Sequence, residues 1–206
     1  GGHYAQWLKR RRPDADELRD PDNQLQHNYS CPQAVRTRLP EELYPTSFVR
    51  DEAVDWIESQ SNSSQPFFAS ISFPDPHHPF TPPGRYWDMY SPDQFEVSLP
   101  YEAHLNPPPH LEACHAQLND GSRKTDSQFL FMAHAHELKE AMALSAGMVS
   151  MIDDAIGTVL DALKQSGRFD DTVIIFTADH GDYLGDFSLL LKGHIPLRSI
   201  NRVPFI

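Results

Sequence analysis

Apolar residues recur at helical spacing in three stretches of the chain. The longest covers residues 133–165, where they fall three or four positions apart: Leu138, Met142, Val149, Ile152, Ile156, Val159, Leu160 and Leu163. This spacing predicts one long helix that ends near Gly167. A second helix is predicted from Ser47, with two acidic residues early in the segment, where the helix dipole favours them. A short third helix is predicted at Tyr4 to Arg10.

Two compact runs of apolar and β-prone residues have the length of strands. They are "FFASISF", Phe67 to Phe73, and "TVIIFT", Thr172 to Thr177. Continuous apolar runs of this kind are typical of strands buried on both faces. The order helix, strand, helix, strand therefore predicts an α/β fold, with a largely parallel sheet and helices on both faces. In such sheets ligands bind at the carboxyl ends of the strands.

The remaining segments are polar and rich in proline. We expect residues 1–46 to be a peripheral, irregular segment. Residues 99–132 contain the helix breakers "NPPPH" and "NDGS" and are interpreted as a surface insertion.

Charge narrows the range of partners. Seventeen Lys and Arg against 29 Asp and Glu give a formal net charge of −12. Such a chain is poorly suited to bind nucleic acid or an anionic membrane, and an anionic substrate would need a locally positive site. We also expect no membrane-spanning segment, and the stretch "GGHYAQWLKRRRPD" has neither the apolar core nor the cleavage site of a signal peptide.

The two cysteines, Cys31 and Cys114, lie far apart and have no metal-ligand spacing, so they indicate neither a disulfide scaffold nor a zinc site. The cellular compartment and the oligomeric state stay open.

Polar residues follow the second predicted strand at once. Asp179 and His180 offer a carboxylate and an imidazole that could converge on a divalent cation. Two adjacent ligands do not complete a site, and the alternative is an ordinary polar turn. The pair Asp153-Asp154 lies inside the long predicted helix and is interpreted as its solvated face.

Two further residues are candidates for a role in catalysis or binding. His77 lies with His78 in "SFPDPHHPF", where the prolines restrict the backbone and favour a positioned proton donor. The alternative is a turn whose histidines face solvent. Lys192 follows "FSLLL" and could reach into a cleft, although most lysines of this kind are solvated surface residues.

Taken together, these motifs resemble one family. "TVIIFTADHGDYLGDFSLLLKG", preceded by "MVSMIDDAIGTVLDALKQSG", is similar to the second conserved block of the sulfatases and the related phosphonate monoester hydrolases. "PFFASISFPDPHHPFTPPGRYWDMY" resembles the strand and P-H-x-P-F loop of that family, and "RVPFI" resembles the strand after its active-site lysine. The resemblance spans at least Ser47 to Ile206. It implies that residues 1–206 are part of one catalytic domain with an alkaline-phosphatase-like fold, incomplete in this chain.

The resemblance also implies roles for individual residues. Asp179 and His180 would be metal ligands. His77 would contact the sulfuryl oxygens or protonate the leaving group, and Lys192 would neutralise charge on the transferred group. The cation implied is Ca²⁺, with Mn²⁺ as the alternative.

Three features of the family have no counterpart here. A C-x-P-S-R-like motif, whose cysteine or serine is converted to formylglycine, is expected upstream of this sequence, together with an amino-terminal aspartate pair and a carboxyl-terminal subdomain. "CPQAVR" at Cys31 lacks the Pro-Ser-Arg run, so we assign no nucleophile within these residues. Phe187 stands where many relatives have histidine.

The implied activity is a sulfuric ester hydrolase that acts on a small-molecule or glycan sulfate ester. It would form alcohol and sulfate through a covalent intermediate on a nucleophile outside these 206 residues, which alone we expect to be inactive. One alternative is a phosphonate monoester or phosphodiester hydrolase on the same scaffold. Another is a non-catalytic fragment or relative. Residues 99–132 are the segment that we expect to influence the choice of alcohol.

Overall fold

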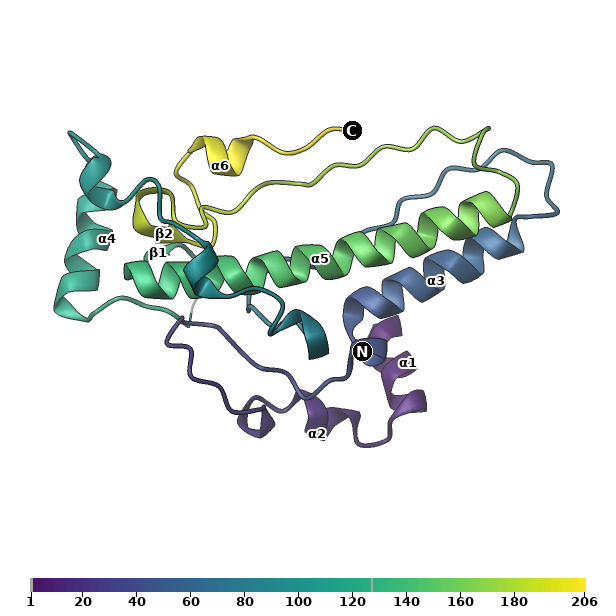
Figure 1. Ribbon diagram of the computed structural model, residues 1–206, viewed down its shortest axis with the longest axis horizontal. Coiled ribbons are helices and arrows are strands. Elements are labelled where there is room, and N and C mark those ends of the chain that lie inside the picture. The colour runs from purple at the N-terminus through teal and green to yellow at the C-terminus, as the bar shows by residue number, and fades with distance from the viewer. Residues whose placement is uncertain (1, 127) are drawn as a thin grey trace. The chain divides into compact units, whose positions relative to one another are not determined.

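The structure is a computed structural model that describes residues 2–126 and 128–206 (Figure 1). Within these residues the α-helices are α1 (His3–Arg11), α2 (Ala15–Arg19), α3 (Pro45–Ser59), α4 (Pro109–Asp120), α5 (Ala135–Gln165) and α6 (Arg198–Asn201). The two strands are β1 (Phe131–Met132) and β2 (Leu189–Leu190). Short 3-10 helices are η1 (Pro21–Asn23), η2 (Glu41–Leu43), η3 (Gly84–Tyr86), η4 (Pro92–Gln94), η5 (Tyr101–Ala103) and η6 (Asp186–Ser188). The three helices predicted from apolar spacing are confirmed as α1, α3 and α5.

The chain divides into two compact units. The first comprises residues 1–27, 35–89 and 145–173, and the second comprises residues 28–34, 90–144 and 174–206. Helix α5 therefore contributes its first ten residues to the second unit and the rest to the first.

The core of the first unit has two buried clusters. In one, α3 packs against the carboxyl-terminal part of α5 through Ala53, Ile57, Val159, Ala162 and Leu163. In the other, α1 packs beside the start of α3 through Trp7, Leu8, Tyr44, Tyr86 and Met151, among others. Residues 1–46 are predicted to be peripheral, but α1 contributes to this core because its tryptophan and leucine are buried there.

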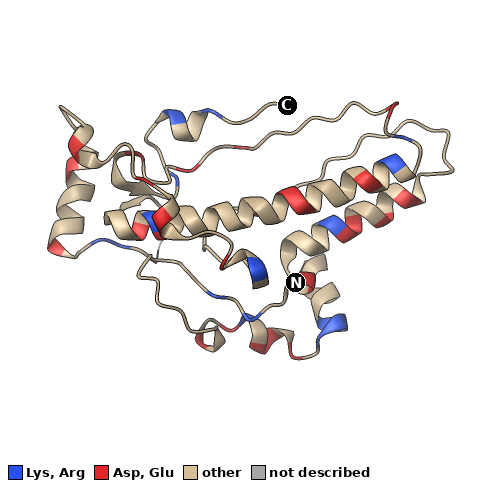
Figure 2. Cartoon of the chain, in the orientation of Figure 1, with Lys and Arg blue, Asp and Glu red and all other residues tan. Residues whose placement is uncertain are grey.

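Helix α5 has no charged side chain between residues 141 and 152 (Figure 2). It is long and apolar enough to cross a membrane, by length and composition only. Leu138, Leu144 and Met148 are nevertheless completely buried within the protein. That burial is typical of the core helix of a globular fold. The adjacent acids Asp153 and Asp154 are exposed, which confirms them as its solvated face.

The second unit is built around β1 and β2. These strands pair antiparallel, with Phe131 opposite Leu190 and Met132 opposite Leu189. Leu111 of α4 packs on them in a cluster that also contains Tyr183 and Ile195. Residues 99–132 thus supply a helix and a strand to this unit as well as exposed loops.

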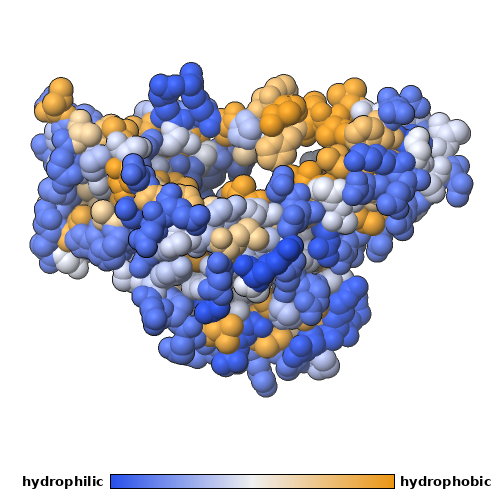
Figure 3. All heavy atoms as spheres, viewed as in Figure 1, coloured by the Kyte–Doolittle hydropathy of each residue, from blue (hydrophilic) through white to orange (hydrophobic). Residues whose placement is uncertain are grey.

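The parallel sheet predicted from the sequence is not confirmed. Residues 67–73 and 172–176 run without strand pairing, and the sheet in the described residues consists of β1 and β2 alone. The apolar side chains of both runs lie exposed: Phe68 at 92% and Val173 at 87%. Figure 3 shows hydrophobic surface along its upper edge, where the segment after α5 and the C-terminal residues run (Figure 1). A strand needs a hydrogen-bonded neighbour, and the second run has one only at its end, where Thr177 bridges Phe205.

Candidate functional site

Asp179 and His180 form a local pair at the end of the second apolar run. The Asp179 carboxylate accepts the His180 amide N–H at 2.9 Å through Oδ1, and its Oδ2 lies 3.7 Å from His180 Nε2. The other ring nitrogen, Nδ1, lies 2.7 Å from the carbonyl oxygen of Gly181 and can only donate to it. The neutral ring therefore carries its proton on Nδ1 and presents the lone pair of Nε2 beside the carboxylate.

This arrangement fits a divalent cation. Two ligand atoms that each lie about 2.0–2.4 Å from one ion are about 3–4 Å apart, which matches the separation of Oδ2 and Nε2. The hydrogen bond to a backbone carbonyl is the usual way in which a ligating imidazole is oriented. Within residues 2–126 and 128–206, no group of three or more His, Cys, Asp or Glu side chains could hold a metal ion. The pair offers two candidate ligands, and a metal site built on it would require further ligands from outside the described residues.

Gly181 fixes the path of the chain after the pair. Its amide donates to the carbonyl oxygen of Ile200 at 2.9 Å, which ties it to α6. A Cβ atom at this position would lie 1.7 Å from the carbonyl oxygen of Ser199. Only glycine allows the two backbones to approach so closely.

Lys192 follows β2, and the residues on both sides of it are held by Tyr183. The Tyr183 amide donates to the carbonyl oxygen of Leu191 at 2.8 Å. The Tyr183 hydroxyl bonds to both backbone groups of Ile195. The segment of Lys192 is thus tied to the chain that follows Asp179 by one buried residue, Tyr183, which sequence reasoning did not identify.

The loop between these two anchors has an unusual backbone. Leu184, Phe187, Ser188 and Leu191 all have positive φ angles, between 38° and 64°. Non-glycine residues rarely adopt this region, and such residues cluster at functional sites.

Two carboxylates act on the charge of Lys192. Burial lowers its pKa, while the carboxylates of Asp182 and Asp179 act in the opposite direction. Burial also raises the pKa of Asp182 to about 6, against the effects of the Leu184 N–H and of Lys192. Lys192 is thus a partly desolvated ammonium in the field of two carboxylates, which differs from a solvated surface lysine. Asp182 is a second residue that sequence reasoning missed, although it lies within the quoted motif.

His77 lies in the first unit and is exposed. Its Nδ1 is 2.5 Å from the carbonyl oxygen of His78, and the two imidazole rings stack with centroids 4.2 Å apart. Because a carbonyl can only accept, Nδ1 carries a proton, and Nε2 is not engaged in this hydrogen bond. This geometry agrees with a positioned proton donor.

Asp75 supports the loop of His77 from within. Tyr44 donates to its Oδ1 at 3.2 Å, and the Thr46 hydroxyl donates to its Oδ2. Burial raises the pKa of Asp75, and these two hydroxyls and His77 oppose that rise. Asp75 is part of the quoted "PDPHHPF" motif, and only its contacts with the start of α3 distinguish it from a turn residue.

Two other residues singled out in the sequence have apolar or buried surroundings. The Phe187 ring lies 4.9 Å from that of His104, so this position makes an aromatic contact inside the second unit. Cys31 is 5% exposed, and both burial and the nearby Glu140 carboxylate raise its pKa. A thiolate is disfavoured there, in agreement with assigning no nucleophile to Cys31.

The structure places Asp179, His180 and Lys192 in one unit. His77 belongs to the other unit, so its convergence with the other three stays a prediction.

Solved structures define the class of protein to which this fold belongs. The phosphonate monoester hydrolase of Agrobacterium radiobacter aligns with 98% of this chain and 40% of its own, at a TM-score of 0.72 and 26% identity. The phosphonate monoester hydrolase of Silicibacter pomeroyi aligns with 96% of this chain and 41% of its own, at a TM-score of 0.65 and 22% identity. The fold is therefore that of the alkaline-phosphatase-like hydrolases.

The family follows from the sequence match. Residues 4–206 match the sulfatase family, and the chain belongs to it. An arylsulfatase of Clostridium perfringens is 32% identical over 80% of this chain and 32% of its own length. The multifunctional alkaline phosphatase superfamily protein PehA of Trinickia caryophylli is 28% identical over 92% of this chain and 38% of its own length. The chain thus spans about a third of the length of these relatives.

Proposed function

We propose that the complete enzyme hydrolyses a sulfate ester to an alcohol and sulfate, with Asp179 and His180 among the ligands of a divalent cation, Ca²⁺ in preference to Mn²⁺. The covalent step takes place on a nucleophile outside these 206 residues, a formylglycine. The substrate is a small-molecule or glycan sulfate ester. Membership of the sulfatase family supports the reaction, and the geometry described above supports the roles of individual residues.

The observation that carries the proposal is the separation of Asp179 Oδ2 and His180 Nε2. At 3.7 Å they suit one shared cation, and the bond from Nδ1 to Gly181 leaves Nε2 free to ligate. A bound cation would supply electrostatic stabilisation of the negative charge on the sulfuryl group.

Lys192 and His77 would act on the transferred group and on the leaving group. Lys192, partly desolvated and anchored by Tyr183, neutralises charge on the equatorial oxygens of the transferred group. When protonated, His77 offers an Nε2–H to the bridging oxygen, which becomes negative as the S–O bond breaks. Its Nδ1–H stays on the carbonyl of His78 and holds the ring in position.

A phosphonate monoester or phosphodiester hydrolase is the second candidate. It is favoured by the match to the Agrobacterium radiobacter enzyme, which covers 98% of this chain. Both reactions transfer a tetrahedral group with charged equatorial oxygens, so the same residues serve either one.

The test uses the complete enzyme after removal of metal with EDTA. We expect Ca²⁺ to restore hydrolysis of 4-nitrophenyl sulfate, and Asp179→Asn or His180→Ala to lose both bound metal and activity. Asp153→Asn, an exposed change on α5, is the control and should alter neither. Turnover of 4-nitrophenyl phenylphosphonate alone would decide for the second candidate. Failure of both substrates would indicate a non-catalytic relative.

A further inference from the structure

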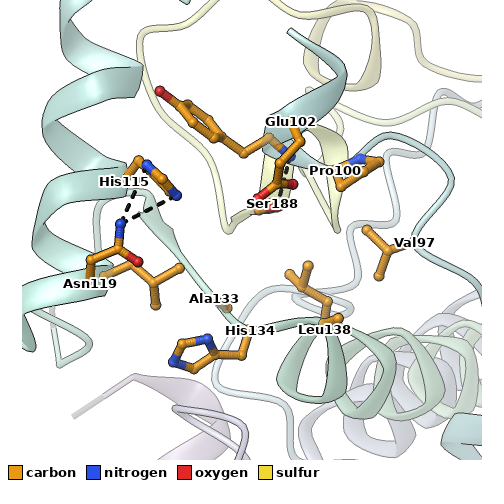
Figure 4. Close-up of a pocket in the computed structure, with 12 residues that line it drawn as sticks. Val97, Pro100, Glu102, His115, Asn119, Ala133, His134, Leu138 and Ser188 are labelled. Carbon is orange, nitrogen blue, oxygen red and sulfur yellow. Dashed lines mark hydrogen bonds between the residues drawn. The ribbon is translucent and has the colours of Figure 1, made fainter.

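A cavity of about 300 Å³ lies in the second unit, between α4, η5 and the start of α5 (Figure 4). Its apolar lining comes from Val97, Leu118 and Leu138. Its polar lining comes from Glu102, His115, Asn119 and His134. The volume is at the small end of the range of small-molecule sites. Asp179, His180 and Lys192 do not line it, so the cavity is separate from the proposed metal site.

The walls of the cavity are held in place by contacts within the unit. The Tyr101 ring stacks on that of His115 with centroids 4.0 Å apart, which joins η5 to α4. The amide of Tyr101 donates to Ser188 Oγ at 3.0 Å, and the amide of Ala133 donates to the Ser188 carbonyl at 2.9 Å. The site is therefore preorganised by the loop that continues into β2.

Ser188 also fixes how far the cavity lies from Lys192. Lys192 lies four positions after Ser188 along the chain. Because an extended chain spans at most about 3.3–3.6 Å per residue, their Cα atoms are at most about 14 Å apart. A ligand of two or three linked rings could thus occupy the cavity with one ring and still place a sulfate ester on another near Lys192.

The lining residues restrict the chemistry of the ligand. The cavity has a carboxylate and no Lys or Arg, so it does not favour an anion. The amide of Asn119 and the imidazoles offer donors, Glu102 accepts, and the leucines provide an apolar surface. An uncharged ring that carries several hydroxyl groups uses all of these features.

We propose that the cavity binds an unsulfated sugar ring of a glycan substrate, one or two units away from the sulfated ring. The inference rests on the proposed sulfatase function and extends it to a substrate class. Hydroxyl groups of the ring donate to Glu102 and accept from Asn119, while its C–H face packs on Leu118 and Leu138.

The test compares two substrates of the complete enzyme. Asn119→Ala and Glu102→Gln change exposed side chains, and Gln117→Ala on the same helix is the control because Gln117 does not line the cavity. We expect the two cavity variants to raise KM for lactose monosulfate on the order of tenfold. Hydrolysis of 4-nitrophenyl sulfate, which carries no sugar ring, should not change. Equal KM values for lactose monosulfate in all variants would overturn the proposal.

Direct binding separates this proposal from the proposed function. Unsulfated lactose should bind to the enzyme by NMR, and Asn119→Ala should weaken that binding while Gln117→Ala does not. If neither sulfate ester is hydrolysed, the proposed function fails, and the lactose measurement still decides on the cavity. Absence of lactose binding to the unaltered enzyme would count against the cavity as a sugar site.

Discussion

The hydroxyl of Tyr183 bonds twice to the backbone of Ile195, donating to its carbonyl oxygen at 2.9 Å and accepting from its amide nitrogen at 3.0 Å. The amide of Tyr183 bonds in addition to the Leu191 carbonyl. Tyr183 is 1% exposed, so these bonds are shielded from water. Tyr183 therefore holds residues 192–194, including Lys192, from both ends, through its backbone amide at Leu191 and through its side chain at Ile195.

Tyr183→Phe keeps the ring and removes the hydroxyl. It leaves the N–H and C=O of Ile195 unsatisfied, which should cost about 1–3 kcal/mol of stability. Because Lys192 loses its support, we expect kcat/KM for a sulfate ester to fall about tenfold, with metal content unchanged. Tyr4→Phe is a matched control, since the Tyr4 hydroxyl also bonds to a backbone carbonyl, that of Leu43 in the first unit. An equal loss of kcat/KM in both variants would indicate a general effect of stability.

Gly181→Ala should disrupt the metal site without changing a ligand. The new Cβ would require the carbonyl of Ser199 to move, and the turn that carries Asp179 and His180 would move with it. We expect metal affinity to fall, measured by titration of Ca²⁺ into the metal-free complete enzyme. Gly157→Ala is the control, because a Cβ at Gly157 meets nothing within 4 Å. Unchanged affinity in Gly181→Ala would show that α6 is free to shift.

Lys192→Ala should lower kcat/KM for a sulfate ester. Loss of one charged donor to a transferred anionic group costs on the order of 2–4 kcal/mol of transition-state stabilisation. The exposed Lys124→Ala serves as the control for net charge and should have little effect. Comparable activity in the two variants would assign Lys192 to a structural role.

The ion pair of Arg123 and Glu137 should make stability depend on pH. Burial alone would raise the pKa of Glu137, but the Arg123 guanidinium and the His134 amide outweigh it, so the net pKa lies below its usual value of 4.5. The two Arg123 bonds are 2.7 and 2.6 Å long, and His134 N–H donates at 2.7 Å. A carboxyl with a depressed folded pKa stabilises the fold above pH 4.5 and loses that contribution as pH falls through the folded value.

Glu137→Gln should therefore cost about 3 kcal/mol near pH 7, and the difference from the unaltered enzyme should shrink below about pH 4. Denaturant unfolding of both proteins between pH 3 and pH 7 measures it. The exposed Glu112→Gln on α4 should show no such difference. A gap between the two proteins that does not vary with pH would mean that the carboxylate charge is not the cause.

Residues 1–206 expressed alone should aggregate and should not turn over a sulfate ester. Ile175, Phe205 and Ile206 are mostly exposed, as are Phe68 and Val173, and unpaired apolar runs of this kind associate readily. Size-exclusion chromatography and an aryl sulfate assay with Ca²⁺ or Mn²⁺ test both statements. A monomeric product with multiple turnover would require Cys31 to be reconsidered as a nucleophile.

The local spacing of apolar residues was sufficient to predict the helices, but it was not sufficient to predict the sheet. Helix α5 was predictable because its apolar residues pack along one strip of the helix itself, with hydrogen bonds that it makes internally. A strand depends on neighbours that are remote in sequence, so the composition of "TVIIFT" indicated apolar surroundings without showing what provides them. Strand β1 was missed for the same reason, because a strand of two residues is too short to show an alternation of apolar and polar positions.

The site was predicted in part. Asp179, His180, His77 and Lys192 could be named from their motifs, because the residue types and their order carry the resemblance. The role of Tyr183 could not be predicted. It depends on a loop in which Leu184 and Leu191 adopt positive φ angles, and no spacing in the sequence indicates that path.

The pairing of β1 with β2 limits how the enzyme can be engineered. Redesign of substrate preference would naturally begin with residues 99–132, yet Met132 pairs with Leu189, three residues before Lys192. A graft that shifts β1 by one residue would reverse which side chains face Leu189 and Leu190. The resulting displacement of β2 would also move Lys192, which follows it. Replacement loops are better joined at the tip around Leu105, which is 101% exposed. There the chain can change length without altering the register of the strand that supports Lys192.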